Sequence, residues 1–452
     1  MTLPMTRRAA ETVTAGRGYG RIRCGFLDVV HSNYVSVGFV FGPGVDEGRL
    51  LAGLRRALFL VPSFAGRLRV RPGGVDIVCG DAGVPVTVFD VEATREEAVF
   101  DMSSPDTGFG DPADLESGPV ELRPLLTVRL YRLADGALVV GCSWHHTAGD
   151  LHSFIVFMQA WSACVEGGAP PRIRVVGDRE AHLDGFLPEA DSGRSGYRLL
   201  TSAEREPRGE PGEVLDGQNK QVTQIHFAPQ ELERMRAAFG GTAGGNLSST
   251  DVVSAHVVTA MRRLRGDGGV NVSSIVGLRA RLGIPAGFIG NPLWPMVISS
   301  PSSQSAAGLA HRIREGLDDF PRRHLNIRTS RTFINETGGS WPGDYGRVHG
   351  VPEDPIYRVT SWRNSGAYHV SFDGRFPSFF NFLPTGLSRL PSSLGPLVSL
   401  IEAPERGGLL VTLLTSGVRA EELRSAVGRG MIHRFGEPGD ARPTVLSVLD
   451  LA

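Results

Sequence analysis

The sequence is almost without lysine. Of its 47 basic residues only Lys220 is a lysine, and all the others are arginines. The 48 acidic residues balance them to a formal net charge of -1. A chain with so little net charge has no electrostatic reason to bind nucleic acid or an anionic membrane surface. We therefore expect neither as a partner.

Cysteine is also scarce, and long apolar runs are missing. The four cysteines, Cys24, Cys79, Cys142 and Cys164, are widely spaced without a C-x-x-C pair, which favours reduced thiols over a disulfide framework. The sequence starts without an apolar stretch of signal-peptide length, and no later run approaches the roughly 20 apolar residues of a membrane span. We expect a cytoplasmic monomer, without a bound metal because no metal-ligand spacing is present.

What the chain does have is enough length for two hydrophobic cores. Its 452 residues, 41% of them hydrophobic, predict two domains. Periodicity is lost after residue 167 and returns near residue 221, so we predict an N-terminal domain over 1–205, a crossover linker over 206–222 and a C-terminal domain over 223–452. The connections that can be assigned are hairpins, which favours an α/β fold with mixed sheets over a doubly wound parallel sheet.

One stretch, GCSWHHTAGDLHSF at residues 141–154, places polar residues between two apolar segments. The segment before it predicts the second strand of a hairpin, and the segment after it has an apolar face at helical spacing over residues 151–166. His146 and Asp150 thus stand in a turn between a strand and a helix. A histidine there is either a general base, since its ordinary pKa of about 6.5 suits proton transfer at neutral pH, or a hydrogen-bonded structural residue.

The H-x-x-x-D pattern of His146 and Asp150 resembles the active-site motif of the CoA-dependent BAHD acyltransferases. HHTAGD also fits the motif of the wider superfamily, which includes condensation domains and chloramphenicol acetyltransferase. Four further segments resemble that family in the same order: LRRALFLVPSFAGRLRV, STDVVSAHVVTAMRRLR, VGLRARLGIPAGFIGNPL and TSWRNSGAYHVSFDGRFP. The resemblance implies two similar-sized mixed-sheet domains that meet at a channel holding the histidine, with acyl-CoA entering from one face and the acceptor from the other.

The chain departs from the family pattern at two places. Leu151 follows Asp150 where the family usually has glycine. In SFDGRFP, residues 371–377, only Phe372 and Pro377 align well with the family's D-F-G-W-G segment. A role that other members assign to the tryptophan of that segment therefore cannot be carried over to this chain.

The resemblance implies that His146 is the base and that neighbouring residues support it. Two roles stay open for Asp150: it orients the imidazole, or it clamps the turn through an ion pair with Arg279 or Arg281, which the resemblance favours. An extended chain sends His145 to the face opposite His146, so we interpret His145 as a core or supporting histidine.

Other residues are candidates for substrate contacts. A tetrahedral intermediate needs hydrogen-bond donors for its oxyanion, and Asn291, Thr360 and Ser361 lie in segments that resemble the channel lining; Asn291 has the alternative of capping a turn. Phe380 is a candidate for the acceptor pocket, with core packing as its alternative. The basic segment 322–328, RRHLNIR, is the candidate for the CoA phosphates, with a solvated surface as its alternative.

The sequence therefore predicts an acyltransferase that uses acyl-CoA as co-substrate and holds no bound cofactor. The expected acceptor is the hydroxyl, less readily the amine, of a small secondary metabolite. Two alternatives stay open: a free-standing condensation-type enzyme that takes its acyl group from an acyl carrier protein, and a non-catalytic member of the fold that only binds a ligand.

Overall fold

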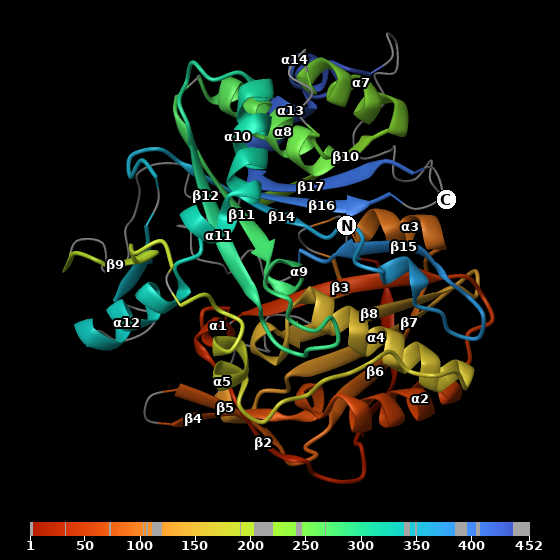
Figure 1. The fold of residues 1–452 in the computed structure, drawn as a ribbon. Helices are drawn as coiled ribbons and strands as arrows, with labels where there is room; N and C mark the ends of the chain where they lie inside the picture. The colour runs from red at the N-terminus through yellow and green to blue at the C-terminus, as the bar shows by residue number, and fades with distance from the viewer. Residues whose placement is uncertain are drawn as a thin grey trace.

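Two six-stranded sheets organise the chain (Figure 1). The computed structural model describes residues 3–31, 33–71, 74–102, 104, 107–110, 120–189, 191–202, 220–240, 246–266, 268–338, 344–348, 350–384, 396–403 and 407–436. Both sheets mix parallel and antiparallel neighbours and carry helices, as the sequence predicted for the fold class.

The first sheet has the strand order β1-β6-β7-β8-β3-β15. In chain order its strands are β1 (Met5–Val13), β3 (Tyr34–Phe41), β6 (Val84–Val91), β7 (Leu126–Leu133), β8 (Leu138–His145) and β15 (Pro377–Phe382). Helices α2 (Glu47–Leu60) and α4 (Leu151–Glu166) pack against each other, and their apolar faces belong to the same core cluster as the sheet. β7 and β8 form the predicted antiparallel hairpin, and α4 spans the predicted residues 151–166.

The predicted domain boundary is wrong at one strand. β15 comes from the second half of the chain but pairs antiparallel with β3 at the edge of the first sheet. Local pattern marks β15 as an apolar segment and says nothing about which sheet it joins. The predicted linker, 206–222, lies outside the described residues up to residue 219, and β10 begins at Lys220. The aperiodic stretch before it also contains a short helix, α5 (Arg179–Asp184), which the sequence analysis missed.

The second sheet has the strand order β10-β17-β16-β14-β11-β12. Its strands are β10 (Lys220–Phe227), β11 (Val270–Gly277), β12 (Leu293–Ser300), β14 (Ile356–Ser361), β16 (Leu397–Glu402) and β17 (Leu409–Ser416). One face packs on the buried helix α8 (Ser249–Arg265), which contributes to the second core cluster. The other face meets the first domain, because Trp362 and Ile401 belong to the core cluster of the first sheet.

Smaller elements complete the fold. The two further sheets have the orders β2-β5-β4 and β13-β9. Their strands are β2 (Gly20–Arg23), β4 (Arg67–Arg71), β5 (Gly74–Cys79), β9 (Tyr197–Leu199) and β13 (Tyr345–Arg347). The remaining α-helices are α1 (Phe26–Val29), α3 (Arg95–Asp101), α7 (Pro229–Gly240), α9 (Arg279–Leu282), α10 (Ala306–Asp318), α11 (Phe320–Arg323), α12 (Ile327–Thr337), α13 (Gly417–Arg424) and α14 (Ala426–Ile432).

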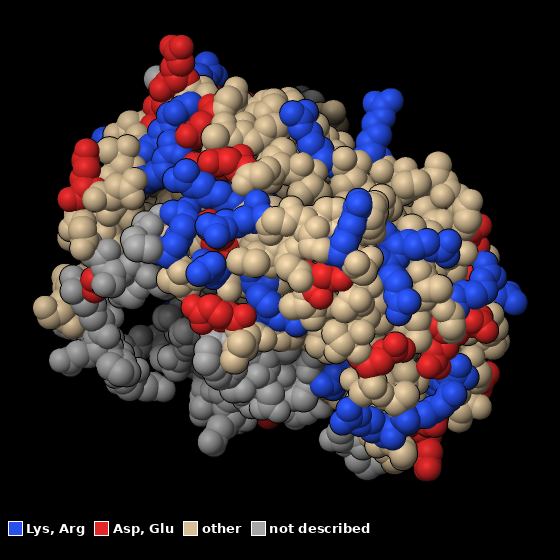
Figure 2. All heavy atoms as spheres, turned by 90° about the horizontal axis from the view of Figure 1, so that it is seen from below, with Lys and Arg blue, Asp and Glu red and all other residues tan. Residues whose placement is uncertain are grey.

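Figure 2 shows basic and acidic side chains interspersed over one face of the molecule, in keeping with the formal net charge of -1. Among the described residues, no helix is long and apolar enough to cross a membrane, and no group of three or more His, Cys, Asp or Glu side chains is arranged to hold a metal ion.

Candidate active site

His146 and Asp150 lie in the turn that joins β8 to α4. β8 is an inner strand, paired with β3 and β7, and all its residues are buried, so the turn emerges directly from the core. α4 begins at Leu151, and Asp150 caps it by accepting a hydrogen bond from the Ser153 amide at 2.9 Å. Leu151 is thus the first helical residue, a position that needs no glycine, although the family usually has one there.

The His146 imidazole is held from the second domain. His146 Nδ1 lies 2.8 Å from Asn291 Oδ1, and Asn291 Nδ2 donates to Asp28 Oδ1 at 2.8 Å. A carboxylate only accepts hydrogen bonds, so the Asn291 amide must turn its nitrogen to Asp28 and its oxygen to His146. His146 Nδ1 therefore carries the proton, and Nε2 is the basic nitrogen. No described residue hydrogen-bonds to Nε2.

A buried arginine completes this network. Arg179, on α5, is 0% exposed and pairs with Asp28 at 3.1 Å. Its other donors reach the carbonyl oxygens of Thr147 at 2.8 Å and Ala148 at 2.9 Å, in the turn next to His146. A buried ion pair is costly to break, because loss of one partner leaves an unpaired buried charge. Asp28 and Arg179 therefore fix both the turn and the amide that orients the imidazole.

Asp150 is paired with Arg279 and does not touch His146. Arg279 Nη1 lies 2.5 Å from one Asp150 oxygen, and Nη2 lies 3.0 Å from the other. Burial alone would raise the pKa of Asp150, but the Arg279 guanidinium and the Ser153 amide outweigh it and hold the pKa below its usual value. Asp150 therefore clamps the turn through its ion pair with Arg279 and does not orient the imidazole. Arg281 instead donates to the Leu317 carbonyl at 2.7 Å.

Two further histidines lie next to His146: His145 precedes it in the chain, and His31 stacks on its ring. His145 is 4% exposed, and its Nδ1 accepts a hydrogen bond from the Thr147 amide at 3.3 Å. Burial lowers the pKa of His145 to about 4, with a contribution from the nearby His146, so it is a neutral core histidine. His31 stacks on the His146 ring with the ring centroids 5.0 Å apart, and burial holds its pKa well below the usual value.

The basicity of His146 follows from the same surroundings. Burial lowers the pKa of His146 below its usual value, because an imidazolium loses hydration there. Asp150, the Asn291 hydrogen bond and Asp28 act in the opposite direction without cancelling the effect of burial. The imidazole is therefore neutral at neutral pH, the state in which it can accept a proton.

The structure corrects two of the predicted substrate contacts, Asn291 and Phe380. Asn291 was a candidate oxyanion donor, but both ends of its amide are engaged with His146 and Asp28. Phe380 is 0% exposed and packs on Phe39 with the rings 4.6 Å apart, so it is a core residue. Ser361 is exposed, with its hydroxyl 3.5 Å from that of Thr250, and stays a predicted substrate contact.

The remaining candidates for substrate contacts are Thr360 and the basic segment 322–328. Thr360 accepts a hydrogen bond from the Trp362 indole at 3.2 Å, which leaves its own hydroxyl hydrogen available. The arginines of the predicted phosphate segment have partners within the chain. Arg322 and Arg323 pair with Asp319. Arg328 donates to the carbonyl oxygens of Asp184, at the end of α5, and Pro188. This segment therefore offers little free basic charge to a CoA phosphate.

The altered second motif lies far from the base. Ser371 and Gly374 hydrogen-bond to Glu166, the last residue of α4. Fifteen helical residues, about 22 Å, separate that end of α4 from the end that carries the histidine turn. Phe372 is buried between Trp161 and Phe41. The departure from the family pattern there does not touch His146.

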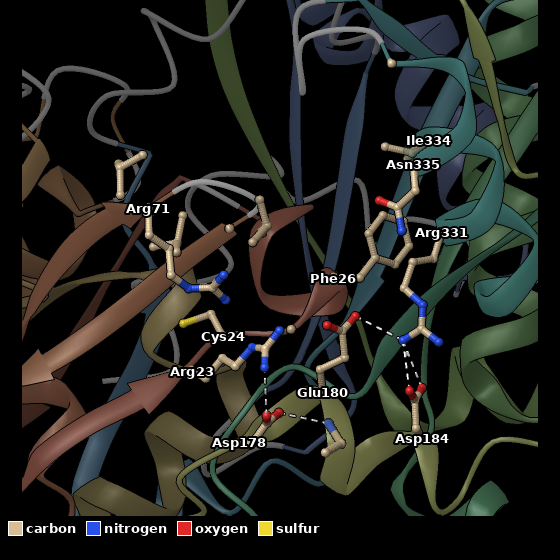
Figure 3. A pocket seen from close by; sticks show the side chains of 17 residues that line it. Arg23, Cys24, Phe26, Arg71, Asp178, Glu180, Asp184, Arg331, Ile334 and Asn335 are labelled. Carbon is tan, nitrogen blue, oxygen red and sulfur yellow. Dashed lines mark hydrogen bonds and ion pairs between the residues drawn. The ribbon is translucent and has the colours of Figure 1, made fainter.

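A cavity of about 910 Å³ opens where the two halves of the chain meet (Figure 3). Helices α1 and α5 line it from the first half and α12 from the second. Arg331 of α12 pairs with both Glu180 and Asp184 of α5, at 3.0 and 2.9 Å. His146 does not line the cavity, but the helices in its wall carry Asp28 and Arg179 to the histidine turn.

Sequence reasoning missed Asp28, Arg179 and His31. Asp28 had one signal, an acidic residue alone within the apolar stretch GFLDVV, since carboxylates are seldom buried without a partner. Arg179 and His31 had none, because nothing in the sequence around them indicates what they contact.

The chain was compared with known protein families and proteins. Residues 44–381 match the model of the family described as "Transferase family". The chain belongs to this family, the BAHD acyltransferases. It is similar to Agmatine coumaroyltransferase-1 of Hordeum vulgare, 28% identical over 80% of this chain and 85% of that protein. It is also similar to a Putrescine hydroxycinnamoyltransferase of Oryza sativa subsp. japonica, 27% identical over 82% of this chain and 87% of that protein.

Solved structures agree with the BAHD fold. Vinorine synthase superposes with a TM-score of 0.65 at 17% identity and covers 92% of this chain and 96% of its own. F. graminearum TRI101, solved with coenzyme A and T-2 mycotoxin, gives a TM-score of 0.67 at 15% identity, covering 90% and 97%. At these identities the likeness shows the fold alone. With the family match, it makes the protein an acyltransferase with two mixed-sheet domains.

Proposed function

We propose that the protein transfers an acyl group from acyl-CoA to the amine of a small acceptor, with His146 as general base. The observation that carries the proposal is the state of the imidazole. Asn291 fixes its Nδ1 from the second domain, and its Nε2 has no partner among the described residues. A neutral imidazole held in one orientation with one open nitrogen is the arrangement that general-base catalysis requires.

In the proposed reaction, His146 Nε2 accepts the proton of the acceptor. The acceptor nitrogen forms a bond to the thioester carbonyl carbon while its proton passes to His146 Nε2. The negative charge moves to the carbonyl oxygen, for which the Thr360 hydroxyl is the predicted donor that is still available. When the carbon–sulfur bond breaks, the imidazolium returns the proton to the CoA sulfur. An amide and free CoA result, and His146 is neutral again.

The acceptor class rests on the relatives. Sequence analysis favoured a hydroxyl, whereas the two relatives described above are named for agmatine and putrescine, both amines. We therefore place the amine first. The test is a set of amine and alcohol acceptors with matched skeletons, assayed with one acyl-CoA by mass of the product. Acylation confined to the alcohols would overturn this choice without affecting the role of His146.

The donor is tested in the same assay. We expect turnover with acyl-CoA and none when the same acyl group is presented on an acyl carrier protein. Two condensation domains share the fold, with TM-scores of 0.62 and 0.59 at 11% and 17% identity, which shows no more than the fold. Turnover with the carrier alone would make the protein a condensation-type enzyme instead.

The pH dependence of kcat/KM should reflect the lowered pKa of His146. Its burial favours the neutral ring, so the base stays unprotonated until the pH falls below the ordinary histidine value of about 6.5. We expect kcat/KM, calculated on the concentration of the unprotonated acceptor amine, to be level from pH 8 to about pH 6.5 and to decline only at lower pH. A decline that starts above pH 7 would show that the base is more easily protonated than this environment allows.

Asn291→Leu should damage catalysis without removing the base. Without the Asn291 oxygen, the imidazole loses its fixed orientation and its preference for a proton on Nδ1. We expect kcat to fall about 100-fold, the effect of a small misplacement of a catalytic group, with little change in the KM for acyl-CoA. Steady-state kinetics at saturating acceptor measure this. An unchanged kcat would remove Asn291 from the positioning network.

A further inference from the structure

His31 covers one face of the His146 imidazole. The two ring centroids are 5.0 Å apart, and the ring planes are inclined by 26°. The N–H bonds and lone pairs of an imidazole lie in the plane of its ring, so two stacked rings neither hydrogen-bond to each other nor exchange a proton. The stack therefore leaves the edge of His146 free for its contact with Asn291 through Nδ1. His31 is thus not a proton relay for the base.

The backbone around His31 is fixed to the histidine turn. The His146 amide donates to the Asn33 carbonyl oxygen at 2.8 Å. The Thr147 hydroxyl donates to the Asp28 carbonyl oxygen at 3.1 Å. These two contacts flank His31 in the sequence, so its segment cannot shift without displacing the turn. The stack is therefore built into the way the two segments pack.

His31 contributes a ring rather than a hydrogen bond within the protein. Its Nε2 is buried and has no hydrogen-bond partner among the described residues. Burial holds the pKa of His31 well below its usual value. The charges of His146 and Arg347 act in the same direction as burial, and Asp150 acts against them. His31 is therefore a neutral aromatic ring at neutral pH.

A neutral ring in this place favours the charged state of the base. When His146 takes the proton of the acceptor, it becomes a cation within the roughly 6 Å of a cation–π contact with the face of His31. This attraction is present for the imidazolium and absent for the neutral imidazole. It therefore offsets part of the effect of burial, which disfavours the imidazolium of His146.

We propose that His31 is a positioning residue that stabilises the imidazolium of His146 through the face of its ring. The inference rests on the proposed function, in which that imidazolium forms as the acceptor attacks the thioester. Asn291 holds the edge of the imidazole, and Asp28 holds Asn291. His31 adds a contact to the face of the ring, and this contact strengthens as the charge develops.

Two substitutions separate the aromatic face from the volume of the side chain. His31→Phe keeps an aromatic face without the nitrogens, whereas His31→Leu fills similar space without an aromatic face. Both side chains are apolar and desolvate His146 to a similar degree, so a difference between the variants measures the effect of the face. His31→Met is a second variant without a ring, for use if His31→Leu does not fold.

The charges around the stack are the same in all these variants. The charged and titratable groups near the two rings, or paired with a group that is, are Asp28 on α1, His145 and Asp150 at the two ends of the turn, Arg179 on α5, Arg279 on α9 and Arg347 on β13. None of them is replaced. A change in the pKa of His146 therefore comes from the substitution at residue 31.

The pKa of His146 is a readout that needs no turnover. It is measured by NMR titration of protein labelled at histidine Cε1, with the His146 signal assigned by its loss in His146→Gln. We expect His31→Leu to lower the pKa of His146 by about 1, a tenfold weaker proton affinity, and His31→Phe to leave it within about 0.3 of the wild type. An equal pKa in His31→Leu and His31→Phe would overturn the proposal.

Kinetics at pH 8 test whether the contact acts during the reaction, because His146 is neutral there in every variant. For His31→Leu we expect kcat about tenfold below the wild type with little change in either KM, and for His31→Phe a kcat within about twofold. His31→Gln keeps a hydrogen-bonding group without a ring and should resemble His31→Leu. If His31→Gln keeps kcat and His31→Phe loses it, His31 acts through a hydrogen bond and the proposal is wrong.

The matched control is His182→Leu. His182 also has a buried Nε2 without a partner and a pKa lowered by burial, and its ring centroid lies 5.0 Å from that of Phe288. The substitution thus removes a similar ring from a contact with Phe288 instead of His146. We expect its kcat and the pKa of its His146 to equal those of the wild type. The same losses in His182→Leu as in His31→Leu would contradict a specific role of the stack.

The two proposals fail in different ways. If the protein acylates no acceptor, the proposed function fails, and the NMR titration still decides whether the face of His31 stabilises the imidazolium. If acylation proceeds and the pKa of His146 is the same in the wild type, His31→Phe and His31→Leu, the general base stands and the role of His31 is wrong.

Discussion

Replacing His146 with alanine should lower kcat about 1,000-fold, within the range that a positioned general base contributes. The variant keeps the turn, because Arg179 still binds the carbonyl oxygens of Thr147 and Ala148. It loses the nitrogen that takes the acceptor proton, while the sites for both substrates stay in place. The KM values should therefore change little. The measurement is steady-state acylation with the wild type and the variant side by side.

The control for this change is His152→Gln. His152 is exposed on α4, and its Nε2–H donates to the Ala286 carbonyl oxygen, 2.7 Å away, a hydrogen bond that a glutamine amide can also make. We expect its kcat to equal that of the wild type. A loss of less than tenfold in His146→Ala would favour the alternative of a family member that only binds or aligns its ligands.

Asp150→Ala should destabilise the protein more than it affects the base directly. The change leaves the Arg279 guanidinium buried without its carboxylate and removes the N-cap of α4. Breaking a buried pair of this kind costs about 3–5 kcal/mol of unfolding free energy. Denaturant unfolding of the variant measures the loss.

The double variant Asp150→Leu with Arg279→Met distinguishes a structural role of Asp150 from a role in orienting the imidazole. It removes both charges together, and we expect it to recover most of the stability that Asp150→Ala loses, because no buried charge is left without a partner. If Asp150→Ala instead keeps its stability and loses kcat as severely as His146→Ala, Asp150 orients the imidazole after all.

The sequence predicted the parts of the site that are local. Apolar periodicity and the polar turn identify β8, the histidine turn and α4, and the helix occupies the residues expected. Alternation along an extended chain separates His145 from His146, and the structure buries His145 as a neutral core residue. Chain length predicted two domains, and the family resemblance added that each has a mixed sheet, a fold that the solved structures share.

The parts that were not predictable are contacts between distant segments. Asn291 meets His146 across 145 residues, and Asp28 meets Asn291 across 263. Such contacts depend on how two domains dock, which no window of sequence encodes. The same holds for β15, whose apolar pattern suits either sheet. It also holds for Arg179, in a stretch that has no periodicity and was taken for linker.

The central claim, acyl transfer from CoA to an amine, is tested most directly by measuring free CoA and acylated amine in one reaction of the purified protein. The account predicts that the two products appear in equal amounts and at the same rate, and that omission of the amine stops CoA release. CoA released without acylated amine would make the protein a thioester hydrolase and contradict the account.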